Sequence, residues 1–516
     1  MGVFRKDCSE DVYRNEAMQR IAVSSILLIS LALPGRAQVS TNVPLGHWSY
    51  ELVDKLADYA LIDSAMLTMR PVTRSEMARH IGQARLHLDH LQSVPPLLSS
   101  LMTKLETEFR GELIQLGVLD GSYGESFVKP VEDPYLKYLY ADRGTGLENV
   151  RGDHFGRHSN YRLGFASRGN VFDVAAFYVH PEYQDGSFES DGDVELIEAY
   201  GKIAAGPFEV QAGKDSLWWG PGRGGSILMS NNAQPSPMIK VTNPHPMQLP
   251  WVFRLLGPFR TQWFLAELEK DRTIPEARLS ALRLNFKPHA RWEMGLSRAI
   301  MFGGRGRPRV DLFDYGEAFL ARSEQDENNQ LAGVDTAILL PLAEIPYAEH
   351  LPLRSIRFYI DAAGEDEAGG IPSNWGVLYG LQFNDILKTG RTDLRIEYAD
   401  NHVPGKPNVF YGHSLYTSGY TYKGRVLGHH MGTDSRDFFV RLSHYATEDL
   451  RVDLTYNRQT HDLSNDSHPV VNIAQCDLTV LQWRHWHVFA GYRYENARGD
   501  GYDDNHILQM QLTLDF

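Results

Sequence analysis

His506-Ile-Leu-Gln-Met-Gln-Leu-Thr-Leu-Asp-Phe516 is the last stretch of this 516-residue chain, and its side chains alternate strictly in character. Neighbouring side chains of a strand point to opposite faces, so the stretch predicts a two-faced strand. The apolar face consists of Leu508, Met510, Leu512, Leu514 and Phe516. The polar face consists of Gln509, Gln511, Thr513 and Asp515. A strand of this kind is typical of a membrane barrel wall, with its apolar face toward lipid.

The same alternation recurs upstream, in segments 394–398, 438–443 and 450–457. In the last of these, Arg451 and Asp453 fall on the polar face, where charges are tolerated in a barrel interior but costly toward lipid. A soluble β-sandwich also alternates, but its polar face is the outer one and its last residue need not be aromatic. We therefore favour a transmembrane barrel over a sandwich.

The length of the alternating region sets the size of the barrel. It runs over residues 135–516, which is about 16–20 strands at roughly 20 residues for a strand and its loop. No run of 18 apolar residues occurs after Ala37, so the sequence predicts no transmembrane helix. Outer-membrane proteins commonly end on an aromatic residue, as this chain does at Phe516.

The N-terminal segment 1–37 is predicted to be a signal peptide, with Met18 as an alternative start. Arg20 supplies a positive charge, Ile21–Leu33 is apolar but too short to span a bilayer, and small residues follow up to Ala37. Cleavage there would remove Cys8 and leave Cys476 without an internal disulfide partner.

Residues 38–116 are predicted to form a small helical domain, joined to the barrel by a linker at 117–134. Thr73-Arg-Ser-Glu76 has the spacing of a capping box. The surrounding stretch, with Trp48 and Pro71, resembles an S-layer-homology module, and that resemblance implies a contact of Arg74 with the cell wall. The alternative is that Thr73 and Glu76 only cap a helix. We expect this domain on the periplasmic side, touching peptidoglycan or closing the barrel.

Composition and motifs argue against several classes of function. The formal net charge of −14 is unsuited to a general nucleic-acid binder. The mature sequence holds no Gly-x-Ser-x-Gly elbow, P-loop or zincin motif. His429, His430 and Asp434 fit no standard zinc spacing. We expect no cofactor, no metal and no catalytic residue.

Segment 213–237 is the densest in motifs, with Trp218-Trp-Gly-Pro-Gly222 followed by Leu228-Met-Ser-Asn-Asn-Ala233. Together with Gly419–Asp434, it resembles the Wzi family of capsule assembly proteins. The resemblance implies a barrel of about 18 antiparallel strands with a small N-terminal α-helical domain. It also implies that the protein holds exported polysaccharide at the cell surface without being an enzyme.

Sugars are bound by aromatic faces and planar hydrogen-bonding groups, and both occur in this segment. The candidate contacts are Trp218, Trp219, Arg223, Asn231 and Asn232. The alternative is structural, with the tryptophans in an interface girdle and the glycines and proline in a turn. Arg305 and Arg307 are further candidates, because arginine forks suit the carboxylates of acidic sugars. A solvated loop is their alternative.

The sequence thus predicts a non-catalytic outer-membrane protein with surface polysaccharide and membrane lipid as partners. Two other classes stay open at this point. The first is a porin or sugar-conducting channel, because a barrel of this width has a lumen that side chains alone do not fill. The second is an outer-membrane hydrolase.

Overall fold

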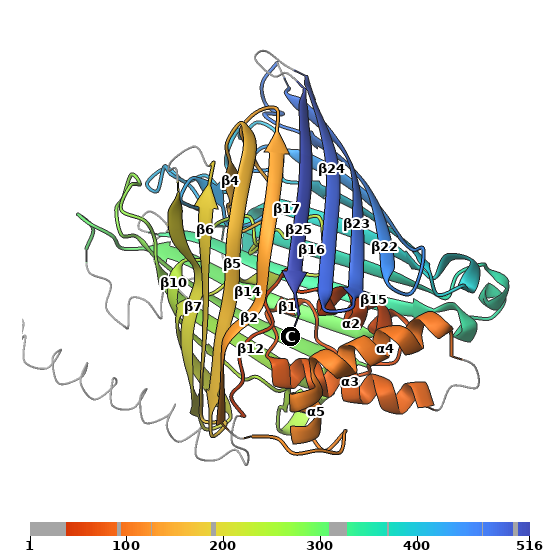
Figure 1. The fold of residues 1–516 in the computed structure, drawn as a ribbon. Helices are drawn as coiled ribbons and strands as arrows, with labels where there is room; N and C mark the ends of the chain where they lie inside the picture. Colours follow the sequence, from red (N-terminus) through yellow and green to blue (C-terminus); the bar gives the residue numbers. More distant parts are fainter. Residues whose placement is uncertain are drawn as a thin grey trace, which may run out of the picture.

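The chain forms a closed antiparallel barrel with a group of helices at one end (Figure 1). The structure is a computed structural model and describes residues 38–89, 94–124, 126–186, 192–308, 328–368, 371–466, 468–498 and 504–515. Within these ranges the barrel has 18 strands, as expected. The predicted signal peptide, 1–37, and the terminal Phe516 lie outside the described residues.

The strands are joined to their neighbours in chain order, and the barrel closes where the first strand pairs with the last. They are β2 (Ser126–Ala141), β5 (His158–Val171), β6 (Ala175–Asp185), β7 (Asp193–Ala205), β8 (Phe208–Lys214), β10 (Pro237–Thr242), β12 (Pro258–Glu267), β13 (Arg278–His289), β14 (Trp292–Phe302), β15 (Asn329–Pro341), β16 (Ser355–Ala368), β17 (Ile371–Asn384), β18 (Thr392–Asp400), β21 (Arg436–Tyr445), β22 (Leu450–Thr460), β23 (Val470–Trp483), β24 (Trp486–Arg498) and β25 (Asn505–Leu514).

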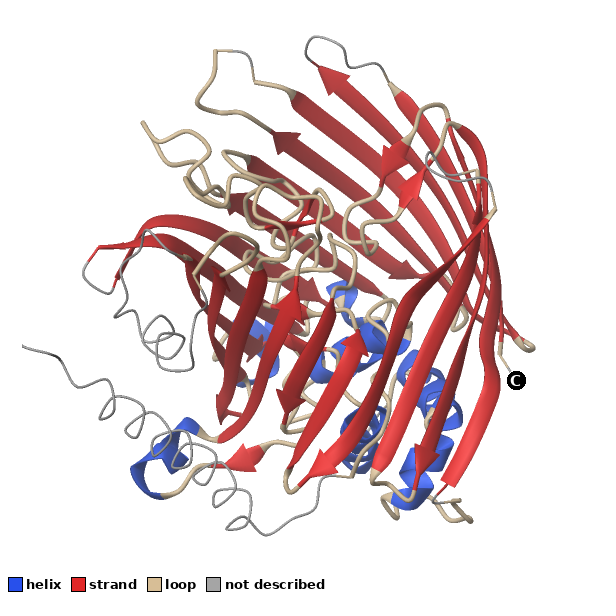
Figure 2. Ribbon diagram, turned by 90° about the vertical axis from the view of Figure 1, so that its left-hand side faces the viewer, coloured by secondary structure: helices blue, strands red, loops and turns tan. Residues whose placement is uncertain are grey.

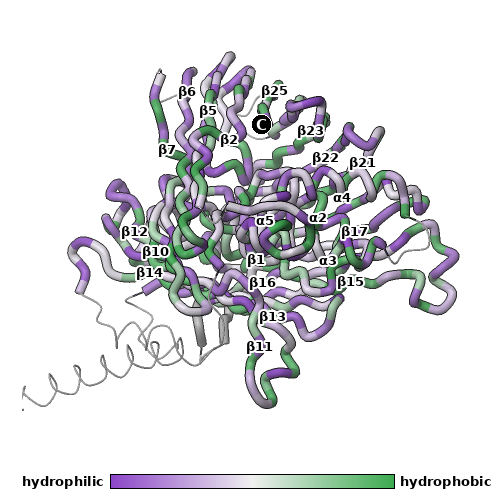
Figure 3. Tube along the Cα trace, turned by 60° about the horizontal axis from the view of Figure 1, so that its bottom comes forward, coloured by the Kyte–Doolittle hydropathy of each residue, from purple (hydrophilic) through white to green (hydrophobic). Residues whose placement is uncertain are grey.

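Along the wall strands, the apolar side chains of the alternating pattern point outward and the polar side chains point into the lumen. In β25, the apolar side chains of Leu508, Met510 and Leu512 are 40–47% exposed on the outer surface. In β22, Arg451 and Asp453 are buried toward the lumen. Figure 3, which brings the helical end forward, shows hydrophobic and hydrophilic residues alternating along the strands. The predicted membrane strands are therefore confirmed in both position and facing.

One predicted boundary differs from the structure. Strand β2 begins at Ser126, inside the segment 117–134 that the sequence assigns to a linker. The pairing of β2 with β5 shifts register around Pro130 and Pro134. Proline has no N–H for the ladder and is tolerated in strands mainly at edges and bulges, so it hides the strand from pattern reading.

The N-terminal region is helical, as predicted, and has an apolar core of its own. Its helices are α2 (Ser49–Asp58), α3 (Arg74–Asp89), α4 (Pro96–Glu108) and α5 (Arg110–Gln115). The hydroxyl oxygen of Thr73 accepts a hydrogen bond from the Glu76 backbone N–H at 3.2 Å, so the predicted cap of α3 is present. Across the described residues, every helix falls short of the length and apolar character that a membrane crossing needs.

The two ends of the barrel are built differently (Figure 2). At the helical end, several strands are joined by two-residue turns, such as 206–207, 290–291 and 484–485. Four short 3-10 helices also lie in connections at this end: η1 (Trp251–Leu256), η3 (Leu342–Glu344), η4 (Ala348–His350) and η5 (Ile386–Lys388). The longest connections lie at the other end, and three of them fold back into the lumen.

Candidate functional site

The three returning connections form what we call the plug: residues 142–157, 215–236 and 401–435. They contain few regular elements, which are the two-residue strands β3 (Thr145–Gly146), β4 (His154–Phe155), β9 (Trp218–Trp219), β19 (Thr421–Tyr422) and β20 (Arg425–Val426). Outside the plug are two more such strands, β1 (Met69–Arg70) and β11 (Met247–Gln248).

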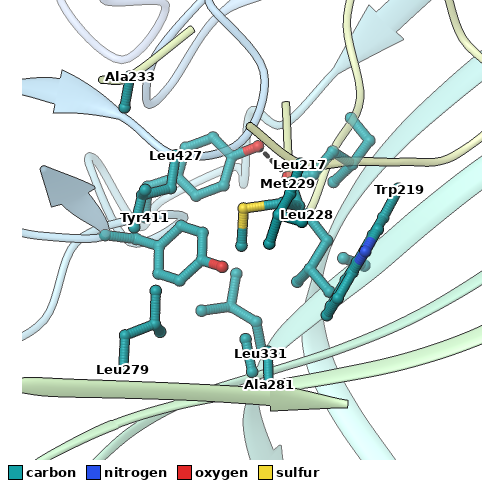
Figure 4. Packing of buried hydrophobic residues seen from close by; sticks show 14 of the residues in the cluster. Leu217, Trp219, Leu228, Met229, Ala233, Leu279, Ala281, Leu331, Tyr411 and Leu427 are labelled. Atoms are coloured by element: carbon teal, nitrogen blue, oxygen red, sulfur yellow. Dashed lines mark hydrogen bonds between the residues drawn. The ribbon is translucent and has the colours of Figure 1, made fainter. Parts of the chain in front are cut away.

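An apolar cluster holds the plug against the inside of the wall. Figure 4 shows Trp219, Leu228, Met229, Tyr411 and Leu427 of the plug gathered together, with Leu279, Ala281 and Leu331 contributed by the wall strands β13 and β15. The inward face of these strands is apolar at this level, whereas lower down β13 turns the polar Arg283 and Asn285 inward. The change from apolar to polar lining marks where the plug ends and the helical domain begins.

Trp219 is a structural residue of this cluster. It is 1% exposed, its indole Nε1 donates to Gln262 Oε1 at 2.6 Å, and its ring packs against Phe264. Trp218 is half-buried, and the pair forms β9, which pairs with β1 of the helical domain. The burial of Trp219 favours the structural alternative for this residue over the predicted sugar contact.

Arg223 lies between the plug and the helical domain. Its guanidinium pairs with Asp54 of α2, and burial lowers the pKa of Arg223 to about 10. Its backbone N–H donates to Glu397 of β18 at 2.8 Å. The side chain is committed to the protein interior, which favours the structural alternative for this residue too.

Carboxylates of the wall fix the path of the plug by accepting backbone N–H groups. Glu397 accepts from Arg223 and Gly224, both at 2.8 Å, and Asp361 accepts from Ile227 at 2.9 Å. Glu365 accepts from Tyr411 at 2.7 Å. Charge-assisted hydrogen bonds of this kind are stronger than neutral ones and here replace the missing secondary structure. Wall strands β16 and β18 therefore act as a template for the plug.

Asn231 and Asn232 join plug segments to each other. Asn232 is 2% exposed, and its amide donates to the Val426 carbonyl at 3.1 Å. The side-chain amide of Asn231 donates to the Asn149 carbonyl at 3.3 Å, and the backbone carbonyl of Asn231 accepts from the backbone N–H of Arg151 at 2.7 Å. The two asparagines thus position neighbouring loops, and Asn231 in particular fixes Arg151.

The other candidate arginines lie away from this region. Arg305 is exposed in the connection after β14, where its guanidinium pairs with Glu276 at 2.8 Å, and Arg307 is half-buried two residues later. Arg74 is buried in the helical domain, paired with Glu112 at 2.6 Å and Glu108 at 2.7 Å. These ion pairs keep Arg74 inside its own domain, which leaves no free guanidinium to contact a cell-wall polymer.

A polar crevice opens where the outer side of the plug meets the wall, at the end opposite the helices. This rim crevice is lined by Arg151, Asp153, Glu182, Gln184, Glu195, Lys214 and Gln234, among others. Its enclosed part measures about 20 Å³, room for about one ordered water, and the rest is open. The exposed Lys423 reaches the same place, donating from Nζ to Gln234 Oε1 at 2.8 Å.

The crevice brings together groups that bind sugars. Amides and guanidinium groups are planar hydrogen-bonding partners for hydroxyl and carboxylate oxygens. Burial acts to lower the pKa of Arg151, but Glu198 and the phenol of Tyr135 outweigh it and raise that pKa. Sequence reasoning missed this set because its members come from five separate segments. The sequence points to the crevice only through Asn231, which belongs to the motif and whose backbone carbonyl positions Arg151.

Three histidines of the plug make contacts within the protein. His430 pairs with Asp437 at 3.1 Å and stacks on His429, and His402 pairs with Asp434 at 2.6 Å. Over the residues that the structure describes, no group of three or more histidine, cysteine or acidic side chains is placed to hold a metal ion.

A closed barrel filled by its own loops and helices defines the class: a plugged β-barrel of the outer-membrane type. The profile of the family "Capsule assembly protein Wzi" matches residues 141–509, and the chain belongs to this family. The predicted family is thereby confirmed. The match begins after the helical domain, and the resemblance of that domain to an S-layer-homology module is not supported.

Two known proteins illustrate the relationship. The structure of Wzi of Escherichia coli, described as an outer membrane protein involved in group 1 capsule assembly and a carbohydrate-binding β-barrel, matches with a TM-score of 0.71 at 20% identity, over 92% of this chain and 100% of that one. An uncharacterized 55.8 kDa protein in the cps region of Klebsiella pneumoniae is 27% identical over 336 residues, 63% of this chain. The chain spans 58% of the length of that relative.

Proposed function

We propose that this protein is a non-catalytic outer-membrane barrel that binds exported capsular polysaccharide and holds it at the cell surface. The observation that carries the proposal is the rim crevice, which presents amides, cations and carboxylates beside the outer side of the plug. Family membership supports it, since the Escherichia coli relative is described as a carbohydrate-binding barrel involved in capsule assembly.

The filled lumen supports anchoring over conduction. Two cavities between the helical domain and the wall measure about 30–40 Å³, which holds a few waters and is too small for a sugar. A cavity beneath the outer surface of the plug is also about 30 Å³. A channel for sugars would need the plug to leave, and its apolar cluster opposes that movement.

The proposed orientation places the helical domain in the periplasm and the rim crevice outside the cell. Its support is that most of the two-residue turns lie at the helical end and the longest connections at the other, which matches the periplasmic turns and extracellular loops of such barrels. Protease added to intact cells should then leave the helical domain uncut. Cleavage within residues 38–116 under these conditions would reverse the orientation.

The role in retention is tested by deleting the gene and measuring cell-bound and shed polysaccharide. The deletion should move polysaccharide from the cell-bound to the shed fraction, and the wild-type gene should restore it. A gene carrying Gln234→Ala and Lys423→Ala should restore it only in part, because both side chains lie at the rim crevice.

The matched control is Lys388→Ala. Lys388 is also an exposed lysine with one hydrogen bond, to the Glu349 carbonyl at 2.6 Å, but it lies at the helical end. It should restore retention fully. Amounts are compared per assembled barrel, so that a loss of protein is not read as a loss of binding. Equal retention by the crevice variant and the control would refute the proposed site.

A further inference from the structure

The outer surface of the wall, which plays no part in the proposed polysaccharide site, carries a groove across strands β22 to β25. It holds about 670 Å³ and is lined chiefly by Leu454, Ala474, Cys476, Tyr492, Tyr494 and His506. Pockets that bind small organic ligands measure about 300–1,000 Å³, so the groove is of ligand size.

The register of the strands explains the groove. Cys476 of β23 pairs with Leu454 on one side and Tyr492 on the other. One step along, Ala474 pairs with Tyr456 and Tyr494. All of these side chains point outward, so two small residues form a floor between rows of large ones. Leu454 is 49% exposed and Tyr492 is 46% exposed, which leaves the walls of the groove open to lipid.

Cationic side chains lie just beyond the groove, in the direction away from the helical end. Arg458 follows Tyr456 by two residues on the same face, about 6.6 Å along the strand. Arg498 follows Tyr494 and Asn496 on that face in the same way. Both arginines are exposed, and among the described residues the Arg458 guanidinium makes no hydrogen bond or ion pair.

The polar groups at the mouth of the groove are otherwise satisfied. Tyr494 donates to the Asp504 carboxylate at 2.7 Å, and Asn496 donates to it at 2.8 Å. The Tyr492 hydroxyl and His506 Nδ1 lie 2.8 Å apart. Asp504, which accepts these two hydrogen bonds, lies on the β25 side, whereas Arg458 lies on β22. Because the Arg458 guanidinium is exposed and has no partner among the described residues, it is available to bind an external anion.

We propose that this groove binds an acyl chain of a phosphorylated lipid, whose phosphate pairs with Arg458. Tyrosines at the boundary of the hydrocarbon region and an arginine beyond them match the order of chain, interface and headgroup in a membrane leaflet. Guanidinium groups bind phosphate oxygens through paired hydrogen bonds. Assignment to the outer leaflet rests on the proposed orientation of the barrel.

Cys476 reports on the occupant of the groove. Protein carrying Cys8→Ser, so that Cys476 is the remaining thiol, is placed in phosphatidylcholine vesicles with or without a bis-phosphorylated acylated glucosamine lipid. N-Ethylmaleimide should modify Cys476 several-fold more slowly when the glycolipid is present. Arg458→Gln should remove that difference, because the acyl chains are then no longer held by their headgroup.

A second measurement counts the phosphorylated lipid that remains bound to purified barrels by native mass spectrometry. Ala474→Phe fills the floor of the groove and should lose the lipid. The matched control Ala199→Phe places the same ring on the outward face of β7, away from the groove, and should keep it. Heat-modifiability confirms that each variant is assembled, and Arg458→Gln leaves the wall packing untouched should Ala474→Phe not assemble.

Two results would overturn the proposal. One is equal protection of Cys476, or equal bound lipid, in the wild type and Arg458→Gln. The other is rapid Cys476–Cys476 disulfide formation between barrels, independent of lipid, which would make the groove a contact between two copies. Neither result bears on polysaccharide retention, which is measured separately and should be normal in these variants.

Discussion

The helical domain and the plug both fill the lumen, but they are held in opposite ways. The helical domain packs its helices around an apolar core that only Tyr445 and Leu481 of the wall join among the described residues, and it also meets the wall through ion pairs, such as Lys55 with Asp393 at 2.7 Å and Arg357 with Asp58 at 2.6 Å. The plug has almost no regular structure, and its core includes side chains of the wall itself. The first is a body docked into the barrel, and the second exists only as part of it.

This difference implies different roles for the plug and the helical domain. A loop segment fixed by wall carboxylates and an apolar cluster can present the rim crevice in one geometry, without a cost of ordering when a polysaccharide binds. A domain docked by charge responds to ionic conditions, because exposed parts of such contacts are screened by salt. We therefore expect damage to the plug to affect the whole barrel, and damage to the docking contacts to affect the helical domain alone.

The largest effect is expected from Trp219→Ala. Removing a buried tryptophan from a core costs about 3–5 kcal/mol, and here Gln262 also loses its hydrogen-bond partner. The temperature at which the barrel loses its compact gel mobility should fall markedly. Trp251→Ala is the control, because Trp251 is 90% exposed. Equal thermal shifts for the two variants would contradict the structural role of Trp219.

Arg223→Ala should destabilise the protein less than Trp219→Ala, and its effect should fall on the helical domain. In this variant Arg70 is the remaining ion-pair partner of the buried Asp54. The lost ion pair should lower the stability of the helical domain by about 1–3 kcal/mol. Protease should cut the helical domain of the variant faster, while the wall stays resistant. The double variant Arg223→Ala with Asp54→Ala should lose less free energy of stabilisation than the two single variants lose in sum. Strict additivity would show that the two side chains do not interact.

Thr73→Ala tests the helical domain without touching its docking contacts. Loss of an N-cap costs about 1 kcal/mol. The thermal transition of the helical domain should shift down, with no change in the plug or in polysaccharide retention. Thr107→Ala is the control, because Thr107 is exposed on α4 and only bonds the carbonyl one turn before it. A fall in retention for Thr73→Ala would mean that the domain takes part in binding.

The smallest effect concerns pH. Burial acts to raise the pKa of Glu51 in α2, but Arg441, Arg223 and Arg451 outweigh it, so the pKa lies well below its usual range. A depressed carboxyl pKa stabilises docking above the unfolded value of about 4.3, and the gain is lost as pH falls through the folded value.

Protease susceptibility of the helical domain should therefore rise below about pH 4. Burial raises the pKa of Asp58, which contributes with the opposite sign. Glu51→Gln isolates the Glu51 contribution and should make the domain susceptible already at neutral pH, with a flatter pH profile. An unchanged profile in Glu51→Gln would rule out Glu51 as the titrating group.

The barrel was predictable because each membrane strand carries its own pattern. Strand β25 shows its alternation within a few residues, and Thr73 marks the start of α3 locally. The plug carries no such period, because its glycines and prolines set a path that only the wall determines. The surroundings of Trp219 depend on Gln262 and on β1, both distant in the sequence. The motif therefore singles out a segment of the plug, but it does not indicate that Trp219 turns inward.

The measurement that tests the central claim most directly is binding of the cells' own purified exported polysaccharide to detergent-solubilised barrels. We predict that Gln234→Ala and Lys423→Ala each weaken binding by about 5–10-fold, the value of one hydrogen bond, with the thermal transition unchanged. Wild-type affinity in both variants, at wild-type stability, would contradict the claim that the outer face of the plug holds the polysaccharide.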